Sequence, residues 1–315
     1  GAAALATQVR SETAMPGPRL EASGTPKICL GLDATGGGFA FGSPPGATAA
    51  TVIPAMADKA AHVTMLQRSP TYFFCYPNRS DLADRLREIG VDEETVHRCA
   101  RLDYLNNLKV LDHRARTEPD VVFEELKALM KEYAGEDFEF APHFTPRYRH
   151  WQQRLAFIPD GDLFVKIKEG KVSAVTDQID HFTPDGIDLK SGDHLKADVV
   201  VAATGFSLLV MGGIEFLVDG ERVDWSQTPT FRGMMFAGVP NMAWVFGYFR
   251  AAWTLRVDLL GDFVCRLLRH MDVIGKDEVR IVVPESLSDQ PLTNWIEDDN
   301  FNPGYLMRDI DKLPK

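Results

Sequence analysis

The chain has 315 residues, of which 45% are hydrophobic and 25% charged, and its formal net charge at pH 7 is −11. This length suits about two domains with sizeable cores, the acidic balance argues against nucleic acid or an anionic membrane surface as a partner, and no apolar stretch is long enough for a membrane span. The four cysteines are far apart and form no Cys-x-x-Cys pair, so we expect neither a zinc site nor disulfides, and a cytoplasmic location.

Residues 1–45 have the composition of a poorly ordered segment, because Gly, Ala, Pro, Ser and Thr dominate there. Lys27–Leu32 and, more weakly, Phe39–Phe41 are strand-like pieces within it. The pattern then changes to an Ala-rich helical stretch, Gly46–Ala61, and a short apolar strand, His62–Leu66.

A helical insertion is predicted next, with two or three helices over Asp81–Tyr133. The apolar residues that recur at helical spacing are Leu82, Leu86 and Ile89, and later Val122, Leu126 and Leu129.

Short elements separated by Gly- and Asp-rich turns are predicted from residue 160 onward. We expect one short amphipathic helix, Gly161–Glu169, followed by a run of strands. These strands are Val172–Thr176, Ile179–Phe182, Gly186–Leu189, His194–Leu195 and Asp198–Ala203.

The last of these strands ends at a turn with the character of a ligand site. Val199–Ala203 is a run of β-branched and small apolar residues, typical of a buried parallel strand, and it stops at Ala203, Thr204 and Gly205. Ligands of open α/β sheets lie outside the carboxyl ends of such strands, and Gly205 has no Cβ to hinder close approach. A tight βα turn without a ligand is the alternative.

The C-terminal part contains fewer elements. We predict strands at Met234–Ala237 and Ala243–Phe246 and a helix over Trp253–Met271. The Pro- and Asp-rich tail from Pro284 is expected to drape over the surface. The predicted apolar face of the helix consists of Leu255, Leu259, Leu260, Val264, Leu267 and Leu268.

A Gly-rich turn before the first helix is a candidate phosphate site. Backbone N–H groups at such a turn can reach a pyrophosphate at the positive end of the helix. Pro44 and Pro45 break the first half of the G-x-G-x-x-G/A spacing, so a plain Pro/Gly loop is the alternative. The candidate residues are Gly42, Ser43, Gly46, Ala47 and Thr48.

The turn after strand His62–Leu66 is a candidate ribose site. An acidic residue at this place selects NAD. Here the chain has Arg68, which can clamp a 2′-phosphate, with Gln67 and Ser69 as neutral donors. The pattern predicts NADPH rather than NADH, and a surface arginine without a ligand is the alternative.

Two further regions, one before residue 155 and one before the last helix, contain cationic or aromatic residues. Arg147–Arg154 is dense in both, and pairing of its arginines with carboxylates is the simplest interpretation. Gly238–Asn241 and Phe246–Thr254 lead into the last helix, whose N-terminus can place donors at an anionic ring or phosphate, although the aromatic residues also suit a core. We find no nucleophile–base pair for hydrolysis and no metal-ligand spacing.

Taken together, these segments resemble the flavin-containing monooxygenases that include the Baeyer–Villiger monooxygenases, above all the mycobacterial ethionamide-activating type. The resemblance covers most of residues 46–315 and rests on several ordered motifs. The segments that carry it are Gly46–Tyr72, His143–Phe164, Val172–Gly220 with the run VVVAATGF, Arg232–Asp272 and Phe301–Lys315.

The resemblance implies an α/β fold in which an atypical segment, residues 1–41, precedes a Rossmann-like NADPH-binding domain, residues 42–205. This domain would carry a helical insertion at about residues 80–150. Residues 206–315 would be the C-terminal part of an incomplete FAD-binding domain, because the family's N-terminal G-x-G-x-x-G unit for FAD has no counterpart in residues 1–45. An N-terminally truncated member of the family is therefore expected.

The resemblance also implies the chemistry and its residues. FAD and NADPH would be the cofactors, and a flavin C4a-peroxide would transfer oxygen from O₂ to a ketone or to a sulfur or nitrogen compound. Arg154 would stabilise that negatively charged species. Ala203, Thr204 and Gly205 would lie between the two domains, and Asn241, Trp253 and Thr254 would approach the isoalloxazine ring. Two alternatives stay open, a non-oxygenating NADPH–flavin reductase of the same architecture and an inactive nucleotide-binding remnant.

Overall fold

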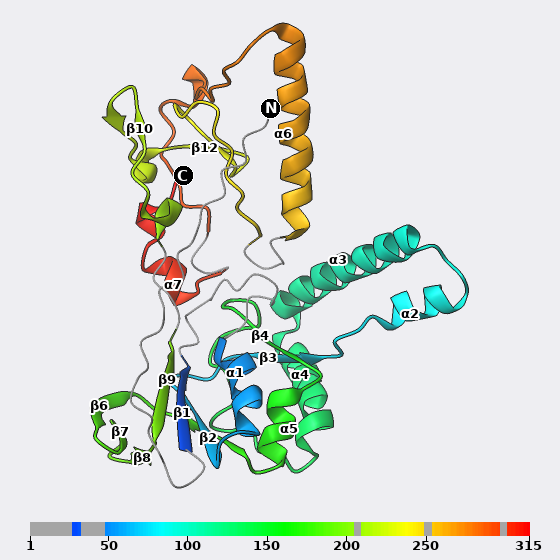
Figure 1. Cartoon of the computed structure of the whole chain (residues 1–315), viewed down its shortest axis with the longest axis vertical. Coiled ribbons are helices and arrows are strands. Elements are labelled where there is room, and N and C mark those ends of the chain that lie inside the picture. The colour runs from blue at the N-terminus through cyan, green and yellow to red at the C-terminus, as the bar shows by residue number, and fades with distance from the viewer. Residues whose placement is uncertain (1–26, 33–47, 205–208, 249–253, 297–300) are drawn as a thin grey trace, which may run out of the picture.

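A computed structural model of the chain describes residues 27–32, 48–204, 209–248, 254–296 and 301–315 (Figure 1). Most of the described residues before 205 fold around a parallel sheet, and those after 208 form short strands and one long helix (Figure 1). The predicted strand Phe39–Phe41 and most of the Gly-rich turn before Thr48 lie outside the described residues.

The main sheet has four parallel strands in the order β5-β2-β1-β9. In chain order this arrangement is 3-2-1-4, the order that begins a doubly wound α/β sheet. Parallel neighbours require crossover connections, and the helices α1 (Thr48–Ala57) and α5 (Asp162–Lys168) serve this purpose. The strands are β1 (Lys27–Leu32), β2 (His62–Gln67), β5 (Val172–Thr176) and β9 (Val199–Ala203), and each was predicted from the sequence to within one residue.

The helix-covered face of the sheet contains the main hydrophobic core. Val63 and Met65 of β2 are fully buried and belong to the same cluster as Ile53 of α1. Burial of such side chains stabilises each by about 1.5–3 kcal/mol relative to exposure. Four phenylalanines extend this core, with ring centroids 5.1 to 5.6 Å apart in edge-to-face or tilted pairs, and they are Phe73, Phe138, Phe144 and Phe164.

A small antiparallel sheet lies against the other face. Leu66 points away from Val63 and Met65 because side chains alternate along a strand, and it packs with Ile187 and Leu189. The three strands were predicted in these places. They are β6 (Ile179–Thr183), β7 (Gly186–Leu189) and β8 (His194–Lys196), hydrogen-bonded in that order.

The helical insertion consists of three helices, as predicted. In Figure 1, α2 (Asp81–Glu88) and α3 (Glu93–Thr117) extend away from the sheet, whereas α4 (Pro119–Ala134) lies against it. The Ser80 and Asp92 side chains cap α2 and α3 by accepting backbone N–H bonds. Only α4 places a continuous apolar stripe in the core, formed by Val122, Leu126, Met130 and Ala134.

The insertion is bracketed by a strand pair that sequence reasoning missed. The strand β3 (Phe73–Tyr76) pairs in parallel with β4 (Ala156–Pro159). The two strands are short, and residues far apart in the chain must meet before either is stabilised. A local pattern therefore gives little sign of them.

The region after residue 208 has short antiparallel ladders and α6 (Thr254–Ile274) (Figure 1). The ladders are β10 (Leu217–Val218) with β11 (Glu221–Arg222), and β12 (Thr230–Phe231) with β13 (Met235–Phe236). Four single turns of 3-10 helix and the short α7 (Gly304–Met307) complete the described elements, the 3-10 turns being η1 (Val210–Gly213), η2 (Trp225–Gln227), η3 (Glu285–Leu287) and η4 (Ile310–Lys312).

Four expectations about exposure and strand structure are wrong. Val199 and Val200 are 42% and 40% exposed, because β9 is an edge strand of the four-stranded sheet. Ala243–Phe246 is not a strand. Its aromatic rings, Trp244 and Phe246, make tilted and edge-to-face contacts with each other and with Trp295, and the segment has no β-ladder partner in the described part of the chain.

The third wrong expectation concerns the tail, whose end is buried. Phe301, Tyr305 and Leu306 are at most 3% exposed, because the last residues carry enough apolar surface for a small core of their own. On α6, Leu260, Val264 and Leu267 face the interior as predicted, but Leu259 and Leu268 are 57% and 53% exposed, since they fall outside the i, i+4, i+7 stripe.

Among the described residues, no helix is long and apolar enough to cross a membrane.

The phenylalanine cluster gives a test of the core. Phe164 is fully buried, so Phe164→Ala should lower the free energy of unfolding by about 3–5 kcal/mol through lost contacts and a cavity. Phe182 is 63% exposed, and Phe182→Ala should change this energy by no more than about 0.5 kcal/mol. Urea unfolding followed by circular dichroism measures both values. Equal losses in the two variants would contradict the packing described here.

Candidate functional site

The carboxyl ends of the four parallel strands lie at one level. Leu32 at the end of β1 is in register with Gln67 of β2 and with Ala203 of β9, and Gln67 is in register with Thr176 of β5. The strand order changes direction between β1 and β9, and ligands of open α/β sheets bind outside such a switch point. The ends of these strands and the described residues that follow them therefore define the candidate site, which we call the carboxyl edge.

Gln67 forms the floor of the carboxyl edge. It is 1% exposed, and its side-chain nitrogen donates to the His143 carbonyl oxygen at 2.6 Å and to Thr176 Oγ1 at 2.9 Å. His143 Nδ1 lies 2.9 Å from the same hydroxyl, and partial burial lowers the pKa of His143. Because the Gln67 side-chain amide donates one hydrogen bond to the His143 loop and one to β5, it links both of these to β2.

Arg68 has the opposite placement. It is the first residue after β2 and is exposed, and the half-buried Ser69 follows it. Thr204, directly after β9, is also exposed, and Ala203 is half-buried. The structure thus brings predicted polar residues from two strand ends to the same edge, where a guanidinium group and two hydroxyl groups can meet a polar ligand.

Several predicted residues cannot be placed beside them. Thr48 is the first residue of α1, as expected for the start of the helix after the Gly-rich turn. The predicted residues Gly42, Ser43, Gly46, Ala47 and Gly205 lie outside the described residues.

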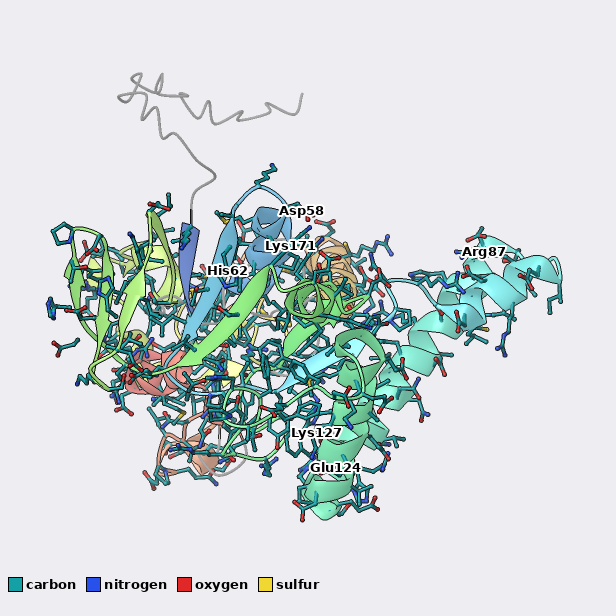
Figure 2. All side chains as sticks on the ribbon, turned by 90° about the horizontal axis from the view of Figure 1, so that it is seen from below. Asp58, His62, Arg87, Glu124, Lys127 and Lys171 are labelled. Carbon is teal, nitrogen blue, oxygen red and sulfur yellow. The ribbon has the colours of Figure 1, made fainter. Side chains whose placement is uncertain are left out.

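The amino ends of the strands, in contrast, are closed by a structural network. Asp58 accepts hydrogen bonds from the Lys171 and Lys166 ammonium groups at 2.7 and 2.9 Å, and these bonds lower the pKa of Asp58 to about 2. His62 Nε2 lies 2.8 Å from Ser173 Oγ between β2 and β5. Figure 2 shows Asp58, Lys171 and His62 close together at this end of the sheet.

Arg154 lies in the turn before β4 and is only 6% exposed. Its Nε and Nη2 atoms both donate to the Tyr305 hydroxyl, at 2.9 and 2.7 Å. The guanidinium carbon is 5.2 Å from the centre of the Phe301 ring, a distance typical of a cation–π contact. Burying a guanidinium group is costly without such partners, and Arg154 obtains these from the C-terminal segment.

The turn that leads to Arg154 is conformationally unusual. Trp151 has a φ of 62°, in the left-handed region that non-glycine residues seldom adopt. The preceding residue, His150, is completely buried, and neither of its ring nitrogens has a hydrogen-bond partner. Burial lowers the pKa of His150 to about 4, against a smaller opposing effect of the Asp112 charge. His150 is therefore a neutral ring packed against Tyr72 and Trp151.

The residues predicted beside a flavin ring are only partly accounted for. Asn241 has a φ of 53°, and its side chain is bonded to the Asp277 carbonyl oxygen at 3.1 Å and the Val279 N–H at 2.9 Å. These bonds make it a link within its own region. Thr254 is the first residue of α6, and Trp253 lies outside the described residues.

A cavity of about 370 Å³ lies near the start of α6. Sequence reasoning had singled out Phe246 and Tyr248 of its lining as part of the segment Phe246–Thr254, but it gave no role to Arg256. Arg256 lies in this lining and donates to the Gly247 carbonyl oxygen at 3.5 Å and to the Arg232 carbonyl oxygen. Sequence reasoning also missed Tyr305, although the segment Phe301–Lys315, which contains it, contributed to the family resemblance. In the described part of the chain, no group of three or more His, Cys, Asp or Glu residues could hold a metal ion. The cavity is lined by Arg232, Gly233, Phe246, Tyr248, Arg256 and Trp295, among others.

Comparison with known proteins identifies relatives over most of the chain. It is 41% identical over 272 residues to the FAD-containing monooxygenase EthA of Mycobacterium tuberculosis. The aligned region covers 86% of this chain and 54% of EthA. It is also 41% identical over 276 residues to the probable FAD-binding monooxygenase AlmA of Acinetobacter baylyi, covering 86% and 53% of the two chains. The chain thus spans about half the length of the relatives it matches. No family model matches it.

Solved structures support the fold. A steroid monooxygenase bound to NADP superposes with a TM-score of 0.58 at 17% identity, covering 84% of this chain and 57% of that protein. OTEMO in complex with FAD and NADP superposes with a TM-score of 0.55 at 16% identity, covering 80% and 52%. At this level of identity, the likeness concerns the arrangement of the elements.

His150 gives a pH-dependent prediction. Its folded-state pKa of about 4 lies below the ordinary value of 6.5, so its contribution to stability is present above pH 6.5 and is lost as the pH falls toward 4. The loss should be about 3 kcal/mol at most. His150→Phe keeps an aromatic ring without a titrating group, and its stability should fall less over this range.

Chemical unfolding at a series of pH values measures this difference. The control is His97→Asn, which alters an exposed histidine on α3 and should keep the wild-type dependence. If His150→Phe and wild type lost stability in parallel below pH 6.5, the buried neutral state of His150 would be refuted.

Proposed function

Because the chain is homologous to FAD-containing monooxygenases over 86% of its length, we propose that it provides the NADPH-binding part of such an enzyme and the C-terminal part of its FAD-binding domain. In this proposal residues 42–205 bind NADPH and residues 206–315 belong to the flavin-binding side. The proposed NADPH site is the carboxyl edge.

The position of Arg68 carries the proposal. It is exposed one residue beyond the carboxyl end of β2, the place at which dinucleotide-binding sheets contact the ribose of the adenosine. A guanidinium group there provides paired N–H donors and a positive charge for a 2′-phosphate, which NADPH has and NADH lacks. Ser69 adds a hydroxyl group, and Gln67 keeps the floor of the site rigid through its two buried hydrogen bonds.

The fit of the chain to NADPH is thus better than its fit to FAD. The carboxyl edge offers an exposed cation and hydroxyl groups at a strand switch point, as an anionic dinucleotide requires. On the flavin side, the Asn241 side chain is already bonded within its own region, and Arg154 is the described residue with the most suitable charge. A complete flavin site therefore needs residues beyond those described.

The reaction class follows from the relatives. A bound flavin would supply the electron transfer and oxygen chemistry, and we propose that this serves oxygenation of a ketone or of a sulfur or nitrogen atom in a small molecule. Arg154 would stabilise negative charge that develops near the flavin, because a buried, oriented guanidinium group acts strongly at low dielectric. The thiol of Cys75 is free and buried, which suits the reducing cytoplasm that we propose as the location.

The cofactor assignment predicts a specific loss of affinity. Arg68→Ala should weaken NADP⁺ binding about 10- to 100-fold, the usual effect of losing a charge-assisted hydrogen bond, and should leave NAD⁺ binding unchanged. Isothermal titration calorimetry at fixed ionic strength measures both.

The matched control is Arg98→Ala, which removes an exposed arginine from α3, away from the carboxyl edge. It should keep the wild-type affinity for both nucleotides. If Arg68→Ala and Arg98→Ala weakened NADP⁺ binding equally, only the overall charge would matter, and the assignment of Arg68 would be lost.

A further inference from the structure

We propose that Tyr305 is a positioning residue for Arg154, so that the C-terminal segment Phe301–Lys315 is part of the flavin-side site. This inference rests on the proposed function for its meaning, because Arg154 matters to catalysis only if a flavin lies beside it. Its structural content, that one hydroxyl group fixes the orientation of one guanidinium group, can be tested independently.

The contact has the geometry of a positioning interaction. Nε and Nη2 lie on one edge of the guanidinium plane, and both donate to the single oxygen of Tyr305, at 2.9 and 2.7 Å. Two bonds from adjacent donors fix the plane and its rotation, whereas a single bond would leave the group free to turn. Tyr305 is 2% exposed and Arg154 is 6% exposed, so water does not compete for these donors.

The chemistry of the acceptor matters as much as its position. A tyrosine hydroxyl is neutral, so it orients the guanidinium group without cancelling its positive charge. The ring of Phe301, 5.2 Å from the guanidinium carbon, supports one side of the group in the same way. Neither of these two contacts brings a negative charge to the guanidinium group.

The backbone of the C-terminal segment places Tyr305 accurately. The Asn302 N–H donates to the Gln152 carbonyl oxygen at 2.8 Å, which joins the segment to the turn that carries Arg154. At the other end, Lys315 exchanges backbone hydrogen bonds with Thr228 and Thr230, at 2.9 and 2.6 Å. Tyr305, Leu306 and Ile310 form a buried cluster between these anchors. The segment is thus a strap between the Arg154 turn and the region of β12.

The direct test compares Tyr305→Phe with Tyr148→Phe. Tyr148 is the matched control, because its hydroxyl lies 2.8 Å from Thr71 Oγ1, whereas the Tyr305 hydroxyl accepts from the Arg154 side chain. Arginine-selective ¹⁵N NMR of the whole chain follows the Nε–H group of Arg154, assigned by its absence in Arg154→Lys. We expect Tyr305→Phe to speed hydrogen exchange at this group by about tenfold or more, and Tyr148→Phe to leave it unchanged.

The inference is overturned if exchange at the Arg154 Nε–H group is the same in wild type and Tyr305→Phe, or if Tyr148→Phe raises it equally. Thermal unfolding of all variants shows whether each remains folded. Were Tyr305→Phe unfolded, Phe301→Leu would replace it, since it removes the ring on the guanidinium group and should also speed exchange.

A second measurement separates this inference from the proposed function. The chain is supplied with FAD, NADPH and a thioether, and both the oxygenated thioether and hydrogen peroxide are measured. In Tyr305→Phe, a smaller fraction of the NADPH consumed should lead to oxygenated thioether, while the rate of NADPH oxidation should stay unchanged. A purely structural role would not shift this ratio. Arg154→Lys tests the proposed function itself. If this variant leaves both the product ratio and the rate of NADPH oxidation unchanged, the proposed role of Arg154 fails, whereas the contact between Tyr305 and Arg154 still stands if the NMR result holds.

Discussion

The alignment of four parallel strand ends is the constraint on which the rest of the structure depends. Because Leu32, Gln67, Thr176 and Ala203 are in register, the carboxyl ends of β1, β2, β5 and β9 lie at one edge of the sheet. The buried hydrogen bonds of Gln67 hold two of these ends and the His143 loop at fixed spacing. Arg68 follows Gln67 directly and is exposed at this edge of the sheet.

A second constraint connects the sheet to the remainder of the chain. The strap of residues 301–315 buries its own apolar residues and holds Arg154 by a neutral hydroxyl. A buried guanidinium group is costly without partners, and the strap supplies two of them, the Tyr305 hydroxyl and the Phe301 ring. In the proposed function, this arginine would stabilise negative charge that develops near a flavin.

The sequence was most informative where local pattern and tertiary structure agree. The strands β5 and β9 and the placement of Arg68 were predicted closely, because β-branched runs ending in polar turns behave the same way in most parallel sheets. It was least informative where partners are distant. The pairing of β3 with β4 spans the helical insertion, the aromatic Ala243–Phe246 stretch has the propensity of a strand but no ladder, and the partnership of Arg154 with Tyr305 joins residues 151 positions apart.

The central claim is that NADPH binds at the carboxyl edge, and hydrogen–deuterium exchange with and without NADPH tests it most directly. The account predicts slower exchange in peptides covering the end of β2 with Arg68 and Ser69 and the end of β9 with Thr204. Peptides from β6–β8 and from α2 should not change. Protection confined to the region after residue 208, or no protection at saturating NADPH, would contradict the claim.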